Sequence, residues 1–226
     1  PDGNVQDVVP NVRKGNGASG WGDAATVIPW VLYHEYDDKV MLETQYQSMK
    51  GWVKYLKSRA KENYIYPGGR YGDWLSFSST ASDYPGAFTD KEFVGTAYFA
   101  RSTQLLAQAA QILGKEEDRK TYSELLSRIK QSFQKEFVTR NGRLSPNTQT
   151  AYVLALSFDL LPEDIRKDAA QRLADDVRKF GHITTGFLGT PEICNVLSDY
   201  GHDDEAYMLL FRKKFPSWLY PVTVGA

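Results

Sequence analysis

The sequence predicts an all-α fold of helical hairpins. Apolar residues recur at helical spacing through most of the 226 residues, and the segments that carry this pattern come in pairs divided by Gly or Pro. The alternation of strands and helices that builds a parallel sheet does not occur. With 42% hydrophobic and 13% aromatic residues, the chain has enough apolar surface for a substantial core. Residues 1–226 are therefore expected to form a single domain or part of a larger one.

The first predicted hairpin joins a helix over residues 24–36 to one over residues 40–60. Asp23 directly precedes the first helix and has a side chain suited to an N-cap. Pro29 lies inside the same helix, where it removes one backbone donor. In the second helix, apolar side chains fall largely on one face, which is typical of an amphipathic helix that packs against a core.

The same cycle predicts three more hairpins. Their helices are expected over residues 91–113 and 116–137, 145–160 and 163–180, and 190–200 and 203–215. Gly114 is placed to end a helix, and Pro162 and Gly201 interrupt the pattern between helices. Eight helices in four hairpins fit two architectures, a solenoid or a closed toroid, because the local periodicity is the same in both.

Residues 64–90 form a long connection between the first two hairpins. Gly, Pro, Ser, Asp and aromatic residues crowd this segment, which predicts a loop rather than a helix. Loops of this length in compact domains are commonly functional, so the segment is a candidate for part of a binding site.

Composition argues against several classes of partner. The 27 Lys and Arg residues nearly balance the 28 Asp and Glu residues, and no basic block is present, so nucleic-acid binding is not expected. No apolar run has the length of a membrane span, so no membrane partner is expected either. Cys194 is the one cysteine and cannot form an internal disulfide, so its simplest interpretation is a small buried apolar residue.

Nothing in the sequence calls for a metal ion or an organic cofactor. His34, His182 and His202 lie far apart and in no metal-binding spacing, and they form no signature of a Ser-His-Asp triad. Residues 15–20 match the pattern G-x-G-x-x-G that precedes a helix in dinucleotide-binding domains. That site needs a parallel βαβ unit, which is not predicted here, so the match is interpreted as an entry loop.

Two short segments combine an aromatic residue with a carboxylate at predicted loops: residues 20–23 (Gly-Trp-Gly-Asp) and 71–74 (Tyr-Gly-Asp-Trp). An indole face covers the apolar C–H patch of a pyranose, and a carboxylate accepts hydrogen bonds from its hydroxyls, so this pairing is typical of sugar sites. A structural interpretation stands beside it: Asp23 caps its helix, and Trp21 and Trp74 belong to the core. Two occurrences in loops favour the functional interpretation.

The order of several motifs resembles that of bacterial α-L-rhamnosidases. The matching motifs run from one end of the chain to the other, which makes the resemblance more specific than any single motif. They are Pro-Asp-Gly at residues 1–3, Gly-Trp-Gly-Asp-Ala-Ala at 20–25, Tyr-Gly-Asp-Trp-Leu at 71–75, Thr-Ala-Tyr-Phe at 96–99, Thr-Gln-Thr at 148–150, Thr-Thr-Gly-Phe-Leu-Gly-Thr at 184–190 and Pro-Ser-Trp at 216–218.

The resemblance implies a toroid of six helical hairpins, of which this chain would supply about eight helices in a segment truncated at both ends. It implies a glycoside hydrolase that removes terminal α-L-rhamnosyl residues with inversion and without a cofactor. Its partners would be a rhamnose-containing glycoside or polysaccharide and the missing domains of the same polypeptide. The resemblance places Trp21 and Trp74 on the aromatic wall around the sugar. Position alone adds Asp23, Asp73 and Tyr98 as polar or rim contacts.

An inverting glycosidase needs a general acid and a general base on opposite sides of the scissile bond. In the family that this chain resembles, the acid lies in a Glu-Arg-x-x-Trp motif and the base in a Trp-Glu motif, and neither motif occurs in residues 1–226. Both catalytic residues are therefore expected outside this chain, and the isolated chain is expected to be inactive. Residues 184–189 would add a loop at the mouth of the barrel. Two alternatives stay open: a helical-toroid glycosidase or lyase for another sugar, and a non-catalytic helical-repeat module.

Overall fold

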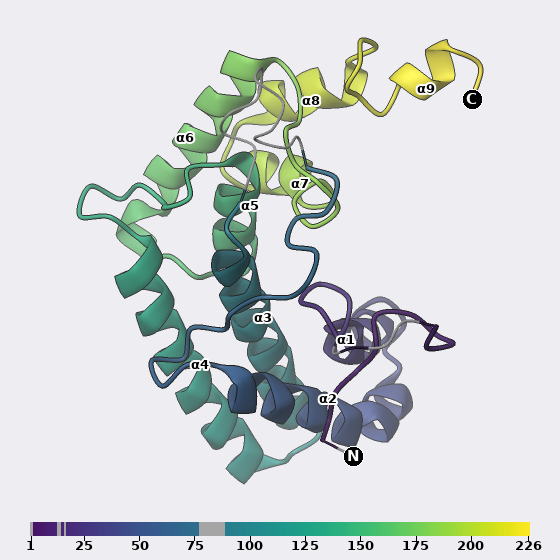
Figure 1. The fold of residues 1–226 in the computed structure, drawn as a ribbon, viewed down its shortest axis with the longest axis vertical. Coiled ribbons are helices and arrows are strands. Elements are labelled where there is room, and N and C mark those ends of the chain that lie inside the picture. Colours follow the sequence, from purple (N-terminus) through teal and green to yellow (C-terminus); the bar gives the residue numbers. More distant parts are fainter. Residues whose placement is uncertain (1, 13–14, 16, 77–88) are drawn as a thin grey trace. The chain divides into compact units, whose positions relative to one another are not determined.

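The computed structural model describes residues 2–12, 15, 17–76 and 89–226. These residues form nine helices and no strand, and their one β-type contact is an antiparallel bridge between Val138 and Leu144 (Figure 1). The chain divides into two compact units, which are described separately below.

Unit 1 comprises Pro1–Gly72 and Lys91–Glu136. Its helices are α1 (Ala24–Tyr36), α2 (Lys39–Arg59), α3 (Lys91–Ile112) and α4 (Glu116–Phe137), the last residue of which already belongs to unit 2. Helix α3 is buried around most of its circumference and contacts both α1 and α2. Phe93 on α3 packs against Phe133 on α4, with ring centroids 4.9 Å apart. Helix α3 is therefore the centre of the unit 1 core.

Unit 2 comprises Asp73–Asp90 and Phe137–Ala226. Its helices are α5 (Gln149–Ser157), α6 (Glu163–Phe180), α7 (Ile193–Asp199), α8 (Asp203–Phe211) and the short α9 (Tyr220–Thr223). The first eight residues of α5 are all buried, whereas α6 buries one face formed mainly by Ala, Leu and Val. Helix α5 contacts α6 and α7, so it occupies the centre of unit 2 as α3 does in unit 1.

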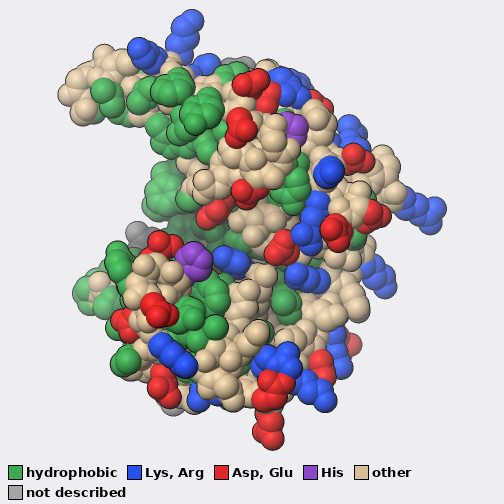
Figure 2. All heavy atoms as spheres, turned by 180° about the vertical axis from the view of Figure 1, so that it is seen from behind, with side chains coloured by type: hydrophobic (Ala, Val, Ile, Leu, Met, Phe, Trp, Pro, Cys, Tyr) green, Lys and Arg blue, Asp and Glu red, His purple; other side chains and the backbone are tan. Residues whose placement is uncertain are grey.

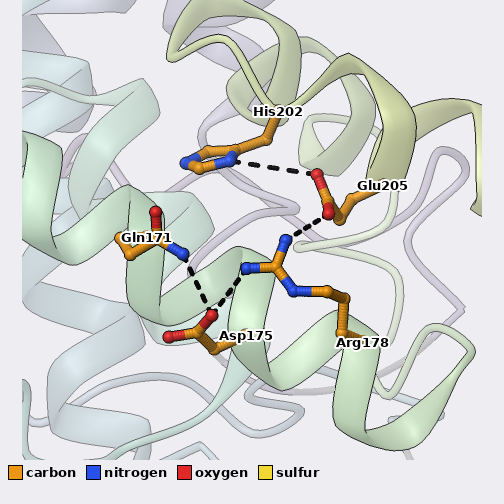
Figure 3. Close-up of polar contacts among 5 residues, drawn as sticks. All are labelled: Gln171, Asp175, Arg178, His202 and Glu205. Atoms are coloured by element: carbon orange, nitrogen blue, oxygen red, sulfur yellow. Dashed lines mark hydrogen bonds and ion pairs between the residues drawn. The ribbon is translucent and has the colours of Figure 1, made fainter.

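Polar side chains join α6 to α8 on the surface of unit 2 (Figure 3). Arg178 donates hydrogen bonds to Asp175 on its own helix and to Glu205 on α8. Asp175 also accepts one from Gln171 Nε2 at 3.0 Å, and His202 Nδ1 lies 3.9 Å from Glu205 Oε2. Because Arg178 and Asp175 are exposed to solvent, this network adds little to the stability of unit 2.

The predicted helices are confirmed, and three of them have the predicted bounds: α1, α4 and α6. Helices α5, α7 and α8 are shorter than predicted. Helix α5 begins at Gln149 rather than at residue 145, because Thr148 is its N-cap, with its side chain accepting a hydrogen bond from Ala151 N at 3.2 Å. Gly114 ends α3 as predicted, with a φ of +67° and its N–H bonded to Gln111 O. Helix α9 was not predicted.

The prediction that Asp23 caps α1 is wrong. Asp23 occupies the N-cap position, but its side chain makes no capping hydrogen bond. Its φ and ψ of −63° and −11° are already helical, whereas an N-cap residue that bonds to the first turn normally has extended backbone. The carboxylate points to other partners instead, which are described below.

Hydrophobic side chains gather over the C-terminal helices of unit 2 (Figure 2, upper left). They include Phe211, which is 69% exposed and stacks on Tyr207 with ring centroids 5.9 Å apart.

Cys194 on α7 is half-buried, with its Sγ 3.9 Å from the carbonyl oxygen of Ala206. None of the helices in the described part of the chain combines the length and the hydropathy needed to cross a bilayer.

Candidate functional site

The buried carboxylate of Asp23 joins three segments of unit 1. Its Oδ1 accepts hydrogen bonds from Trp52 Nε1 on α2 at 2.8 Å and from Ser102 Oγ on α3 at 2.5 Å. Its Oδ2 accepts one from the backbone N–H of Gly20 at 2.8 Å. Asp23 is 1% exposed, so these bonds are shielded from bulk water. Asp23 therefore fixes the Gly-Trp-Gly loop to the two helices beneath it.

Burial also sets the electrostatics of this carboxyl group. Loss of solvation raises the pKa of Asp23 above its usual 3.8, while the hydrogen bonds from Ser102, Trp52 and Gly20 act in the opposite direction. Ser102 Oγ is in turn 2.6 Å from Thr26 Oγ1 on α1, which extends the network to a third helix. A carboxyl group enclosed by protein donors in this way holds structure rather than activating a water molecule.

Trp21 lies between Gly20 and Asp23 in the sequence, and part of its surface stays in solvent. Its ring centroid is 4.5 Å from that of Tyr71, and the two ring planes are inclined by 45°. Tyr98, on α3, is also half-buried. Of the three candidate residues in unit 1, the two aromatic ones are thus accessible in part and the aspartate is not.

Gly22 shows why a glycine separates Trp21 from Asp23. A Cβ atom at Gly22 would lie 2.4 Å from Cη2 of Trp52, whose side chain is fully buried. A larger residue would displace the same indole ring that donates to Asp23. The Gly-Trp-Gly-Asp motif is therefore built around the Trp52 ring.

A second buried carboxylate, Asp73, organises unit 2. Its Oδ2 accepts hydrogen bonds from Thr150 Oγ1 on α5 at 2.5 Å and from the backbone N–H of Gly186 at 2.7 Å. Its Oδ1 accepts one from the backbone N–H of Leu188 at 2.8 Å. Asp73 is 6% exposed. Loss of solvation raises the pKa of its carboxyl group above 3.8, and the donors around it oppose that shift.

Trp74 follows this carboxylate and remains 43% exposed. Its carbonyl oxygen accepts a hydrogen bond from Phe187 N at 2.9 Å. The two side-chain rings lie side by side, with centroids 5.2 Å apart and planes inclined by 58°, and Phe187 is 53% exposed. Unit 2 thus presents two neighbouring aromatic rings to solvent above a buried aspartate.

The loop that carries Phe187 is also anchored to the start of α5. Gln149 Oε1 accepts a hydrogen bond from Thr184 N at 2.8 Å, and Gln149 Nε2 donates to the carbonyl oxygen of His182 at 3.3 Å. Thr150, the next residue of the Thr-Gln-Thr motif, donates to Asp73. This motif therefore fixes the position of the loop relative to Asp73.

The structure gathers the predicted site residues in two groups. Trp21, Asp23 and Tyr98 belong to unit 1, and Asp73 and Trp74 belong to unit 2. Direct contact with a sugar stays a prediction for all five. The burial of the two aspartates favours a supporting role for them, whereas the aromatic side chains keep accessible surface.

Sequence reasoning missed the residues that hold the two aspartates, namely Trp52, Ser102 and Thr150. Each lies inside a helix whose periodicity indicates only that the residue faces the core. Ser102 and Thr150 are polar residues on otherwise apolar helix faces, and that is the signal that marks them as partners of a buried charge.

In the described residues, nowhere do three or more His, Cys, Asp or Glu side chains come together in a way that could hold a metal ion. His34 is exposed and pairs with its neighbour Glu35 at 2.9 Å. His182 is buried, with Nδ1 2.8 Å from the carbonyl oxygen of Ile183. Both histidines therefore have local structural partners.

Comparison with known proteins gives consistent matches along the whole chain. The model of the bacterial α-L-rhamnosidase six-hairpin glycosidase domain matches residues 1–226. An α-L-rhamnosidase of Streptomyces avermitilis is 43% identical over 227 residues, which cover 100% of this chain and 21% of that protein. An α-L-rhamnosidase of Alteromonas sp. (strain LOR) is 41% identical over 231 residues, covering 100% and 25%. The chain thus spans about a quarter or less of the length of these relatives.

Solved structures give the same result. The crystal structure of the Streptomyces avermitilis α-L-rhamnosidase complexed with L-rhamnose matches with a TM-score of 0.91 and 43% identity, covering 99% of this chain and 21% of that one. The α-L-rhamnosidase of Dictyoglumus thermophilum matches with a TM-score of 0.89 and 34% identity, covering 100% and 25%. These matches favour the six-hairpin toroid over the solenoid. The chain belongs to the six-hairpin glycosidase domain family of the bacterial α-L-rhamnosidases.

Proposed function

We propose that this chain forms part of the sugar-binding wall of an α-L-rhamnosidase and that the complete protein hydrolyses terminal α-L-rhamnosyl residues with inversion. One observation carries the proposal: in both units, a partly exposed tryptophan adjoins a buried aspartate that fixes its loop. L-Rhamnose is the sugar bound in the structure of the Streptomyces avermitilis relative, which supports this substrate class.

Trp21 and Trp74 would contact the apolar side of the sugar. L-Rhamnose is a 6-deoxy sugar, so its methyl group and ring C–H groups form an apolar surface that an aromatic face can cover. Such a contact stabilises binding by about 1 kcal/mol for each ring. Tyr98 would contribute at the rim with its phenol group.

The general acid and base belong elsewhere in the protein. An inverting mechanism needs one protonated carboxyl group that faces the glycosidic oxygen and one carboxylate that faces a water molecule. Asp23 and Asp73 are 1% and 6% exposed, and protein donors already occupy the oxygens of both. We therefore assign these two aspartates to support of the binding wall. The proposed reaction uses carboxyl groups alone, without a metal ion or an organic cofactor.

Hydrolysis of a chromogenic α-L-rhamnoside by the full-length protein tests this function, with chromogenic glycosides of other sugars as controls. We expect selective turnover of the rhamnoside and an increase in KM of about fivefold in each of Trp21→Ala and Trp74→Ala. Turnover of another glycoside alone would replace the proposed substrate. Absence of turnover on all glycosides, together with no binding of L-rhamnose, would support the non-catalytic helical module instead.

A further inference from the structure

One side chain of the loop at residues 184–189 stays in solvent. The other five residues of this described loop are buried, whereas Phe187 is 53% exposed. An exposed phenylalanine forgoes the stabilisation that burial of its ring would give, and exposed aromatic surface at a rigid position is typical of a binding site. The position of Phe187 is therefore not explained by the core of unit 2.

The backbone around Phe187 is held by three successive hydrogen bonds. Gly186 N donates to Asp73 Oδ2 at 2.7 Å, Phe187 N donates to Trp74 O at 2.9 Å, and Leu188 N donates to Asp73 Oδ1 at 2.8 Å. The two oxygens of Asp73 thus bind the residues on both sides of Phe187. A loop fixed in this way pays little further entropy when its side chain binds a ligand.

Close backbone contact fixes the loop in the same place. A Cβ atom at Gly186 would lie 2.4 Å from Trp74 O and 2.6 Å from Ser76 N, so only glycine allows the loop to come this near. The opposing turn is itself unusual, because Leu75 has a φ of +60° and is 65% exposed. Backbone strain of this kind persists at binding sites where the surrounding structure enforces it.

We propose that Phe187 is a second sugar-binding ring beside Trp74 and that Asp73 is the positioning residue that holds it there. The inference rests on the proposed function and names a further part of the same wall. Phe187 and Trp74 together form an apolar surface of two adjoining rings, which fits the C–H face of a deoxy sugar. Asp73 acts through the backbone of residues 186–188 and makes no contact with the substrate.

Variants of the full-length protein test both parts of the proposal. Phe187→Ala is expected to raise KM for the chromogenic α-L-rhamnoside about fivefold with kcat changed less than about twofold, and Phe187→Trp is expected to restore KM. Phe211→Ala is the matched control, because Phe211 is also exposed in unit 2 and also pairs with a second aromatic ring. Its KM should equal that of the wild type. A wild-type KM in Phe187→Ala would overturn the proposal.

The role of Asp73 is tested by a double-mutant cycle. Asp73→Asn should raise KM about as much as Phe187→Ala, and the double variant should show little further increase, because both changes remove the same contact. If Asp73 only stabilised the fold, Asp73→Asn would lower the unfolding midpoint and leave KM unchanged. Independent effects that multiply in the double variant would also overturn the positioning role.

The two proposals fail in different ways. A wild-type protein that neither hydrolyses the rhamnoside nor binds L-rhamnose overturns the proposed function, and the role of Phe187 falls with it. An active wild type whose KM is insensitive to Phe187→Ala overturns the role of Phe187 alone.

Discussion

Asp23 in unit 1 and Asp73 in unit 2 follow the same local sequence, an aromatic residue and a glycine, and both are buried. Their donors differ. Two of the three donors to Asp23 are side chains of core helices, from Trp52 and Ser102. Asp73 accepts one hydrogen bond from the side chain of Thr150, and its other donors are backbone N–H groups of a loop, among them those of Gly186 and Leu188.

The partners of each aspartate therefore decide its role. Asp23 connects α2 and α3, so its loss would act mainly on the core of unit 1. Asp73 connects a core helix to a loop with an exposed ring, so its loss would act mainly on the surface that faces a ligand. A local motif of three residues indicates a buried carboxylate but does not distinguish these two roles.

The largest effect is expected where the carboxylate of Asp23 is removed. Asp23→Ala leaves the buried donors of Trp52, Ser102 and Gly20 without an acceptor, which should lower the free energy of unfolding by about 3–5 kcal/mol. Urea unfolding monitored by circular dichroism measures it. Glu43→Ala, which removes an exposed carboxylate from α2, should change stability by less than about 0.5 kcal/mol. Equal effects of the two changes would refute the scaffold role.

An intermediate effect is expected from one methyl group at the glycines of the two regions. Gly22→Ala pushes on the buried ring of Trp52, and Gly186→Ala pushes on the backbone of Trp74. Each should cost about 1–3 kcal/mol of stability. Gly186→Ala should also raise KM for the rhamnoside more than Gly22→Ala does, because it shifts the two exposed rings of unit 2, whereas Gly22→Ala acts on the loop of the single ring of Trp21. Unfolding curves and steady-state kinetics on the same preparations separate the two results, and a raised KM in Gly22→Ala alone would reverse the comparison.

The smallest expected effect is a dependence of protein stability on pH. Because burial raises the pKa of Asp23, the folded protein binds a proton at this group more tightly than the unfolded chain does. The stabilisation from this group is complete below its usual pKa of 3.8 and is lost as the pH rises through the raised folded value. The stability of the wild type relative to Asp23→Asn should therefore fall as the pH rises from about 4 towards neutrality. Urea unfolding across this range would show a difference growing with pH if the sign were wrong.

Much of the fold follows from the sequence because it rests on local signals. The bounds of α1, α4 and α6 follow from apolar periodicity, and Gly114 ends α3 because it adopts a left-handed conformation. The start of α5 was harder to predict: the predicted helix begins at residue 145, whereas α5 begins at Gln149, and its N-cap Thr148 depends on a side-chain hydrogen bond.

The site was predicted only in its aromatic and acidic members. Trp21, Trp74 and the two aspartates were singled out because each tryptophan lies close to an aspartate in the sequence. Phe187 was not singled out within its loop, because its proximity to Trp74 depends on hydrogen bonds across a separation of 113 residues, from Asp73 to Gly186. Contacts of this range are set by the packing of the whole unit, and periodicity does not report them.

The comparison is tested most directly by removing one hydroxyl donor from each aspartate in the full-length protein, with Ser102→Ala for Asp23 and Thr150→Val for Asp73. Each change should cost about 1 kcal/mol of stability. For hydrolysis of the chromogenic α-L-rhamnoside, we predict a raised KM in Thr150→Val and a KM within about twofold of the wild type in Ser102→Ala. An unchanged KM in Thr150→Val, or an equal rise in both variants, would contradict the assignment of Asp73 to the ligand-facing wall.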